Sequence, residues 1–300
     1  MKRIAPFIAV LLIAVSAIYF SEKRHDSAAV SANPLVEVAA DAQRDLTRLP
    51  LRLTRLSDKD EIAIGKELAE RYPLIDQNLT AEQSALNAYV GRVGHTLAIH
   101  AHRHLPYSFH LVPNRSMMNA FSLPGGPVYV GQGLLDQMTS EDELAAVIGH
   151  EIEHIDHYHC AERVQVEARL RKLELGIVGA LVQIPLSVWE AGYNKDEELE
   201  ADREGMRLAV QAGYSPYGAV TLFEKFAKLN SEYIIHAQSP EQELSELAIQ
   251  SLEGYFRSHP QTSERLAQAN AVLVQEGWQD RKRQKPFRVE YEVHNGQFVK

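Results

Sequence analysis

The segment His150-Glu151-Ile152-Glu153-His154 constrains this chain of 300 residues more than any other. It follows Ser140-Glu141-Asp142-Glu143, a capping box that predicts a helix from Ser140 to about Cys160. Residues four apart lie on one face of a helix, about 6 Å apart along its axis. His150 and His154 are therefore expected to bind one zinc ion, with Glu151 facing the metal-bound water.

A site of this kind needs a third protein ligand. Metzincins take it from an H-E-x-x-H-x-x-G-x-x-H motif, but the two further positions here read His157 and Cys160, which excludes that class. A carboxylate from a later helix is the alternative, and the acidic cluster from Glu197 to Asp202 lies about 45 residues downstream. The solvated start of a helix, stabilised by the helix dipole, explains the same cluster. The spacing alone leaves both interpretations open.

The amino-acid composition limits the kinds of metal site and ligand that this chain can have. The chain has 13 histidines and one cysteine, Cys160, so a disulfide framework and a Cys-rich zinc or iron–sulfur site are excluded. Any metal site must use imidazole and carboxylate groups. A net charge of −9 argues against nucleic-acid binding, which needs a basic face. Cys160 itself is expected to be a small buried residue.

The N-terminus predicts export. Lys2-Arg3 precedes an uncharged apolar run over residues 4–20, as in a signal segment. Val15-Ser16-Ala17 offers a cleavage site, but cleavage there would expose Ile18-Tyr19-Phe20, so an uncleaved anchor in contact with the membrane is favoured. Without a cysteine nearby, a lipoprotein is excluded. We expect the protein in the bacterial periplasm or on the periplasmic face of the inner membrane.

The patterns along the chain predict an α+β domain, mostly helical with one small sheet. Its expected limits are residues 57–277, after a linker at 21–56 and before a C-terminal β-hairpin tail at 278–300 with Asn295-Gly296 as the turn signal. Expected strands cover 107–112, 127–130 and 287–293; expected helices cover about 57–72, 80–97, 140–160, 162–192, 196–212, 217–229, 241–256 and 262–276.

Four segments together resemble the CAAX prenyl protease/HtpX-like family of zinc metallopeptidases, in its soluble exported branch. The likeness runs from about Ser57 to Ala271 and implies a zincin-type endopeptidase of the gluzincin class. The matching segments are Asn119-Ala-Phe-Ser-Leu-Pro-Gly-Gly126, Gly133-Leu-Leu135, Glu143-Leu-Ala-Ala-Val-Ile-Gly-His-Glu-Ile-Glu-His154 and Glu198-Leu-Glu-Ala-Asp-Arg-Glu-Gly205.

The resemblance also implies roles for single residues. Glu198 would be the third ligand of one zinc ion per chain, beside His150 and His154. Asp202 would be a second-shell carboxylate that fixes the tautomer of a ligand histidine, and His159 would be structural or second-shell. Glu151 would be the catalytic base.

Three further inferences follow from the same resemblance. His259 and Arg265 match a segment that forms a loop over the cleft, where either would help to stabilise developing charge; a helix-capping role explains His259 equally well. Residues 119–130 would be an edge strand that pairs with an extended substrate. The substrate-binding residues expected there are Asn119, Ala120, Phe121, Gly125 and Gly126.

One departure from the family concerns the membrane. Membrane-embedded relatives carry transmembrane helices between the two motif helices, whereas this chain has only the apolar run Leu175–Trp189, interrupted by Pro185. That difference favours protein substrates at the membrane surface. The alternating His100, His102 and His104 are expected to be an exposed connector, because no acidic or thiolate ligand accompanies them.

The sequence therefore predicts a zinc endopeptidase that cleaves proteins or peptides of the cell envelope, with quality control as the role that the family suggests. Two alternatives stay open. One is a chaperone-like adaptor that keeps the fold without cutting, although a pure binding module has no need for Glu151. The other is a latent protease gated by the His259 loop.

Overall fold

The computed structural model describes residues 55–71, 79–170, 192–236, 259, 263–287, 292–294 and 297–299. All lie in the compact unit Thr54–Lys300. The predicted export segment, most of the linker, the apolar run Leu175–Trp189 and the helix expected at 241–256 lie outside the described residues. Within the described ranges, no helix combines the length and the apolar character needed to span a membrane.

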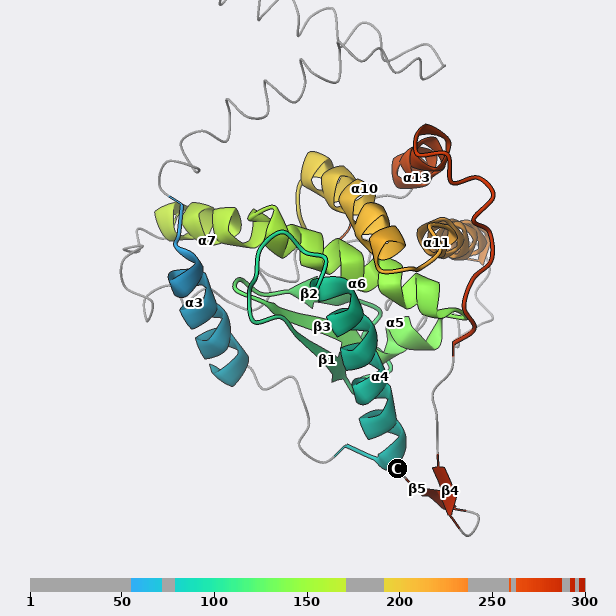
Figure 1. Cartoon of the computed structure of the whole chain (residues 1–300), viewed down its shortest axis with the longest axis horizontal. Helices are drawn as coiled ribbons and strands as arrows, with labels where there is room; N and C mark the ends of the chain where they lie inside the picture. Colours follow the sequence, from blue (N-terminus) through green and yellow to red (C-terminus); the bar gives the residue numbers. More distant parts are fainter. Residues whose placement is uncertain are drawn as a thin grey trace, which may run out of the picture. The chain divides into compact units, whose positions relative to one another are not determined.

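The expected α+β class is confirmed: helices surround one small three-stranded sheet (Figure 1). Strand β1 (Ser108–Val112) pairs in parallel with β3 (Pro127–Gly131), and β2 (Ala120–Ser122) pairs with β3 in antiparallel fashion. The strand order β1-β3-β2 leaves β2 on the outside of this sheet. The turn between β2 and β3 requires glycine, since Gly125 and Gly126 have φ of 81° and 135°.

The helices keep most of the predicted limits. Helix α4 begins after the capping box of Thr80 and Gln83 and packs on β1. A short helix that was not expected, α5, follows β3, and α11 is longer than predicted. The helices are α3 (Asp58–Arg71), α4 (Ala81–Ala98), α5 (Gln132–Asp136), α6 (Glu141–Asp156), α7 (His159–Leu170), α10 (Lys195–Gln211), α11 (Tyr217–His236) and α13 (Ser263–Gln275).

Helix α6 lies at the centre of the fold, between the sheet and α4 on one side and α10 and α11 on the other (Figure 1). Its N-cap is Ser140, whose hydroxyl accepts the backbone N–H of Glu143 at 3.2 Å. The helix is buried over almost its whole length, including Glu151 and both histidines of the motif. Any chemistry on α6 therefore takes place inside the protein.

The predicted end of this helix at Cys160 is wrong. Helix α6 ends at Asp156, and α7 begins at His159, so that Cys160 belongs to α7. Between them Tyr158 has φ of 65°, a left-handed conformation that breaks the helix. The role expected for Cys160 as a small buried residue is confirmed, since its exposure is 0%.

Tertiary contacts explain the break. The ring of Tyr158 lies between the guanidinium groups of Arg55 and Arg103, at 3.7 and 3.8 Å from the ring centroid. The carboxylate of Asp156 accepts the backbone N–H groups of His102 and Arg103 at 2.8 and 2.6 Å. These contacts hold the connector at residues 99–107 against the end of α6, and they outweigh the local helical preference of the sequence.

The C-terminal part of the chain returns to the start of α6. The carboxylate of Asp142 accepts the backbone N–H of Ser215 at 2.5 Å and that of Lys285. Residue Pro286 forms a β-bridge with Ser140. Beyond it, β4 (Glu292–His294) and β5 (Gln297–Val299) pair in antiparallel fashion.

Candidate metal centre

The centre is built where α6 crosses α10. Gly149 and Gly205 lie at the crossing, where a Cβ on Gly149 would come within 2.9 Å of the carbonyl oxygen of Gly205. The absence of side chains lets the two backbones approach closely. Helix α10 begins with a capping box of Asn194 and Glu197, so that Glu198, in its first turn, faces α6.

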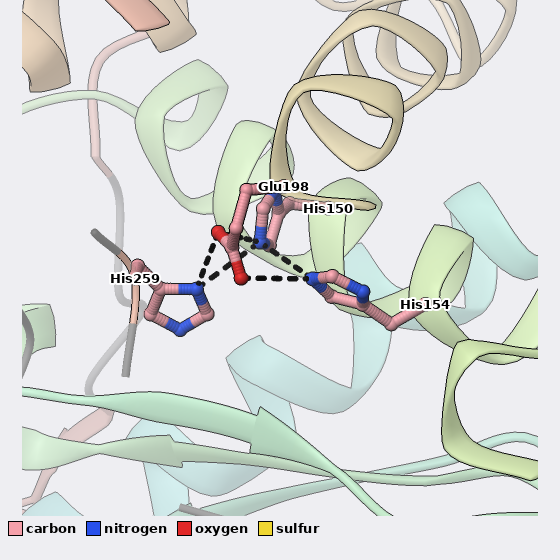
Figure 2. Close-up of side chains that lie close together, drawn as sticks. All are labelled: His150, His154, Glu198 and His259. Atoms are coloured by element: carbon pink, nitrogen blue, oxygen red, sulfur yellow. Dashed lines mark hydrogen bonds and ion pairs between the residues drawn. The ribbon is translucent and has the colours of Figure 1, made fainter. Parts of the chain in front are cut away.

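Four buried side chains converge there, with ligand atoms that all lie within 4.8 Å of one another. Figure 2 shows the carboxylate of Glu198 between three imidazole rings. His150 Nε2 lies 3.0 Å from His154 Nε2 and 3.4 Å from Glu198 Oε2. His154 Nε2 lies 3.6 Å from Glu198 Oε1. His259 Nδ1 lies 3.0 Å from Glu198 Oε2 and 3.3 Å from His150 Nε2.

These separations fit a tetrahedral ion. Ligands bound at about 2.0–2.1 Å to tetrahedral zinc are about 3.3–3.4 Å apart, and the separations among the ligand atoms of His150, His154 and Glu198 run from 3.0 to 3.6 Å. Imidazole nitrogens and a carboxylate oxygen are ligands that suit zinc among the divalent ions. These three residues therefore fit three of the positions of a four-coordinate metal site.

The hydrogen bonds behind the ligands direct their free nitrogens to the same point. His159 Nε2 lies 3.3 Å from Glu200 Oε2, so its N–H donates to that carboxylate. His159 Nδ1 then accepts from His154 Nδ1, at 2.9 Å. His154 is thereby left with the lone pair of Nε2 facing the cluster. The role expected for His159 behind the ligands thus has a geometric basis.

His150 is oriented in a similar way. Its Nδ1 lies 2.9 Å from Asp202 Oδ1, which leaves Nε2 for the cluster. Burial lowers the pKa of His150, but the bonds to Asp202 and Glu198 outweigh burial and raise it to about 10. Burial, with the charge of His150 added, holds the pKa of His154 well below its usual value. The carboxylates thus favour one positive charge at this point, as a bound cation would supply.

Arg265 lies behind Asp202. Its Nε and Nη2 donate to the two oxygens of Asp202, both at 2.6 Å, and its Nη1 lies 3.7 Å from Glu198 Oε2. Burial raises the pKa of Asp202, but Arg265 and, after it, His150 together more than offset this and keep the pKa below its ordinary value. The guanidinium stacks on Phe223 at 4.7 Å and is 2% exposed. These contacts point to a positioning role for Arg265, through Asp202 and Glu198.

The structure brings His259 into the cluster. Its Nε2 lies 3.3 Å from the carbonyl oxygen of Ala120 and 3.6 Å from Glu151 Oε1. His259 therefore bridges the edge strand β2, the predicted base and the ligand group. The cavity beside His150 and Glu151 measures about 20 Å³, which is room for about one water molecule. Its apolar wall consists of Ala146, Val147, Met206, Ala219, Leu222 and Phe223.

The predicted substrate-binding residues have different surroundings. Ala120 presents its carbonyl to His259, as described. The carbonyl of Asn119 accepts the backbone N–H of Gly131 at 2.9 Å, and Phe121 stacks on Tyr129 at 5.1 Å. Gly125 and Gly126 contact α3 and Pro106 through their backbones. Of these five, Ala120 has the contact that supports a role beside the cluster.

Sequence reasoning missed Tyr193. Its ring stacks on that of His154, with centroids 3.8 Å apart and planes 16° apart, and its backbone N–H donates to Glu198 Oε1 at 3.4 Å. Its hydroxyl lies 3.1 Å from Cys160 Sγ. Ser122 and Glu200 were also missed. Ser122 and Glu200 lie inside two of the segments that carry the family resemblance, but at positions to which it gives no role. The signal for Tyr193 was its place just before the acidic helix start.

Comparison with known proteins decides the family. Residues 84–273, more than half of the chain, match the model of Peptidase family M48. The chain belongs to this family. The resemblance to zinc metallopeptidases inferred from the four motif segments is thereby confirmed, and all the residues of the metal cluster lie within the match.

Relatives within the M48 group include mitochondrial metalloendopeptidase OMA1 of Arabidopsis thaliana, which is 32% identical over 54% of this chain and 31% of its own length. Metalloprotease LoiP of Escherichia coli is 37% identical over 37% of this chain and 48% of its own length. The beta-barrel assembly-enhancing protease of E. coli is 30% identical over 57% of this chain and 38% of its own length. The chain thus spans less than half of each of these relatives.

Proposed function

We propose that this protein is a zinc-dependent endopeptidase that binds one zinc ion per chain through His150, His154 and Glu198. The observation that carries the proposal is the convergence of these three residues and His259 on one point, with Glu151 next to His150 on the same helix. Membership of family M48 and the names of the relatives support the same activity.

Zinc, when bound, polarises the substrate carbonyl and lowers the pKa of a water molecule towards about 7. The residues of this chain transfer the protons and hold the ligands in place. Glu151 accepts the proton of the attacking water at Oε1, the oxygen that faces His259, and passes it to the nitrogen of the departing amine. Asp202 and Arg265 hold His150 in place, and the chain of His159 and Glu200 holds His154.

The substrates in this proposal are exported proteins of the cell envelope, and the role is their quality control. The apolar N-terminal run after Lys2-Arg3 supports export to the periplasm or its membrane face. The name of the beta-barrel assembly-enhancing protease relatives supports a role in the cell envelope. The outer position of β2 supports recognition of extended chains by strand addition.

Substitution of the base tests the activity. Glu151→Gln is expected to keep one zinc ion per chain and to lose nearly all digestion of casein, because the amide has no basic oxygen. Wild-type turnover in Glu151→Gln would refute the assignment. Glu198→Ala is expected to lose the metal as well, and stoichiometric zinc in that variant would show that the ligand set is different. A wild-type protein that binds no zinc would instead favour the adaptor function.

A second candidate is a latent form of the same protease, gated by His259. Two observations favour it. His259 Nδ1 lies within ligand distance of the cluster, where water would otherwise bind, and its Nε2 contacts the Ala120 carbonyl, where a substrate strand would pair. The cavity beside Glu151 is too small for a peptide. Activity that appears in His259→Ala and not in the wild type would support latency; equal or lower activity in the variant would refute it.

A further inference from the structure

Ser122 contacts the carboxylate of Glu151. Its hydroxyl lies 2.9 Å from Glu151 Oε2, and each residue is 1% exposed. Ser122 is held in the edge strand β2 by its pairing with Val128 of β3, and Glu151 is held by α6. The bond therefore connects two elements that meet at the candidate centre. Neither the motif analysis nor the proposed reaction gives Ser122 a role.

The bond uses the oxygen of Glu151 that is not needed for proton transfer. The other oxygen, Oε1, lies 3.6 Å from His259 Nε2, and the ring of His259 contacts His150 of the cluster. With Oε2 engaged by Ser122, the carboxylate is fixed in rotation and Oε1 faces the ligand group. A carboxylate oxygen in such a buried place requires a donor.

The thiol of Cys160 and the hydroxyl of Tyr193 lie in a row behind the Ser122 side chain. Its hydroxyl oxygen lies 3.6 Å from Cys160 Sγ, which in turn lies 3.1 Å from the hydroxyl of Tyr193. Burial raises the pKa of Cys160 to about 12, so the thiol keeps its proton. Each of the three groups has one proton, and that of Ser122 goes to Glu151. The thiol donates to the backbone carbonyl oxygen of Ser122, at 3.9 Å, so that the thiol and the phenol form a row of contacts behind Ser122.

We propose that Ser122 is a positioning residue for the catalytic base: its hydrogen bond to Glu151 Oε2 holds the carboxylate so that Oε1 is presented to the water and the departing amine. Cys160 and Tyr193 support it through the same row of bonds. This inference rests on the proposed function, because it requires Glu151 to act as the base. When a catalytic group is misplaced, the turnover rate falls more than the affinity for substrate does.

The test is steady-state kinetics on the zinc-loaded full chain with a peptide substrate cleaved by the wild type. Where latency requires it, all variants are made in the His259→Ala background. Ser122→Ala is expected to lower kcat about tenfold with KM within about twofold of the reference, because binding groups are untouched. Ser122→Thr, which keeps the hydroxyl, is expected to recover most of the loss. Ser116→Ala, which removes an exposed hydroxyl, is the matched control and should equal the reference.

Two measurements separate positioning from a structural effect. Zinc content and zinc affinity should be unchanged in Ser122→Ala, and the residual rate of Glu151→Gln should not fall further when Ser122→Ala is added. Cys160→Ala, which removes a more distant donor, should lower kcat about two- to threefold. The Cys160→Ala variant therefore still tests the proposed role of Ser122 if the Ser122→Thr protein does not fold.

The outcomes are distinguishable from failure of the proposed function. An inactive Glu151→Gln with a fully active Ser122→Ala would overturn the positioning role alone. So would a Ser122→Ala variant whose loss is accompanied by loss of zinc, or whose effect is the same with and without Glu151. An active Glu151→Gln would overturn the proposed function, and the inference would fall with it.

Discussion

Gly149 of α6 and Gly205 of α10 contact each other through their backbones at the crossing that brings the carboxylates to the histidines. A Cβ on Gly205 would lie 2.8 Å from the backbone nitrogen of His150, a distance at which one of the helices must shift. The spacing between the imidazole of His150 and the carboxylates of Glu198 and Asp202 is therefore set by two residues without side chains.

Gly205→Ala is expected to push α10 away from α6. The overpacking should lower the free energy of unfolding by about 1–3 kcal/mol, and the displacement of Glu198 should weaken zinc binding by about tenfold or more. Denaturant unfolding and competition with a zinc chelator measure the two effects. Gly91→Ala is the matched control, because a Cβ there meets nothing within 4 Å; it should leave zinc affinity unchanged. Normal zinc affinity in Gly205→Ala would contradict the prediction.

Arg265→Ala should destabilise the fold strongly. It removes the two guanidinium donors from the buried carboxylate of Asp202, which keeps its contact with His150; breaking a buried ion pair in this way costs about 3–5 kcal/mol. Arg265→Lys should recover part of this, since one ammonium cannot replace a bidentate guanidinium. The control is Arg203→Ala, which breaks a partly exposed pair with Glu204 and should cost less than about 1 kcal/mol. Equal unfolding curves for the two alanine variants would refute the prediction.

Glu200→Ala should weaken zinc binding without touching a ligand. It removes the carboxylate that holds the proton of His159 on Nε2. The Nδ1 of His159 then no longer has to accept from His154, and the tautomer of His154 is less firmly fixed. Removal of such outer contacts typically costs 10- to 100-fold in metal affinity, which is the range we expect. Chelator competition is the measurement, with Glu67→Ala on the exposed face of α3 as the control. An unchanged affinity in Glu200→Ala would show that His154 is oriented by other means.

Cys160 should make stability depend on pH in the alkaline range. Burial raises the pKa of its thiol from 9.0 to about 12 in the folded protein. The folded state therefore binds the proton more tightly than the unfolded state, a contribution that is complete below pH 9 and lost as the pH rises towards about 12. Cys160→Ala should lose less stability than the wild type between pH 9 and 11 in denaturant titrations. Parallel losses in the two proteins would rule out this contribution.

The sequence predicted most of what local rules control. Capping boxes placed the starts of α4 and α6, and the spacing of His150 and His154 placed two imidazoles on one helix face. The end of α6 was wrong, because residues 157–160 are acceptable in a helix and the break depends on Arg55 and Arg103 around Tyr158. Those contacts come from distant segments and leave no periodic signal.

The rest of the site depended on tertiary contacts in the same way. Spacing alone did not decide whether Glu198 is a ligand, and only the family resemblance implied that role. The position of Glu198 rests on the close crossing of the helices at Gly149 and Gly205. His259 was assigned equally to a cap and to the cleft, and the structure brings it to the cluster. Tyr193 and Ser122 act through packing and hydrogen bonds that no motif encodes.

The carboxylate of Asp142, near the start of α6, joins parts of the chain that are synthesised far apart in time. Its two backbone partners, Ser215 and Lys285, follow it by 73 and 143 residues. Both backbone partners of this carboxylate in the first turn of the helix are therefore present only once the chain has been made as far as Lys285. A product truncated before Lys285 would therefore carry the motif on a helix whose beginning lacks one of these two anchors.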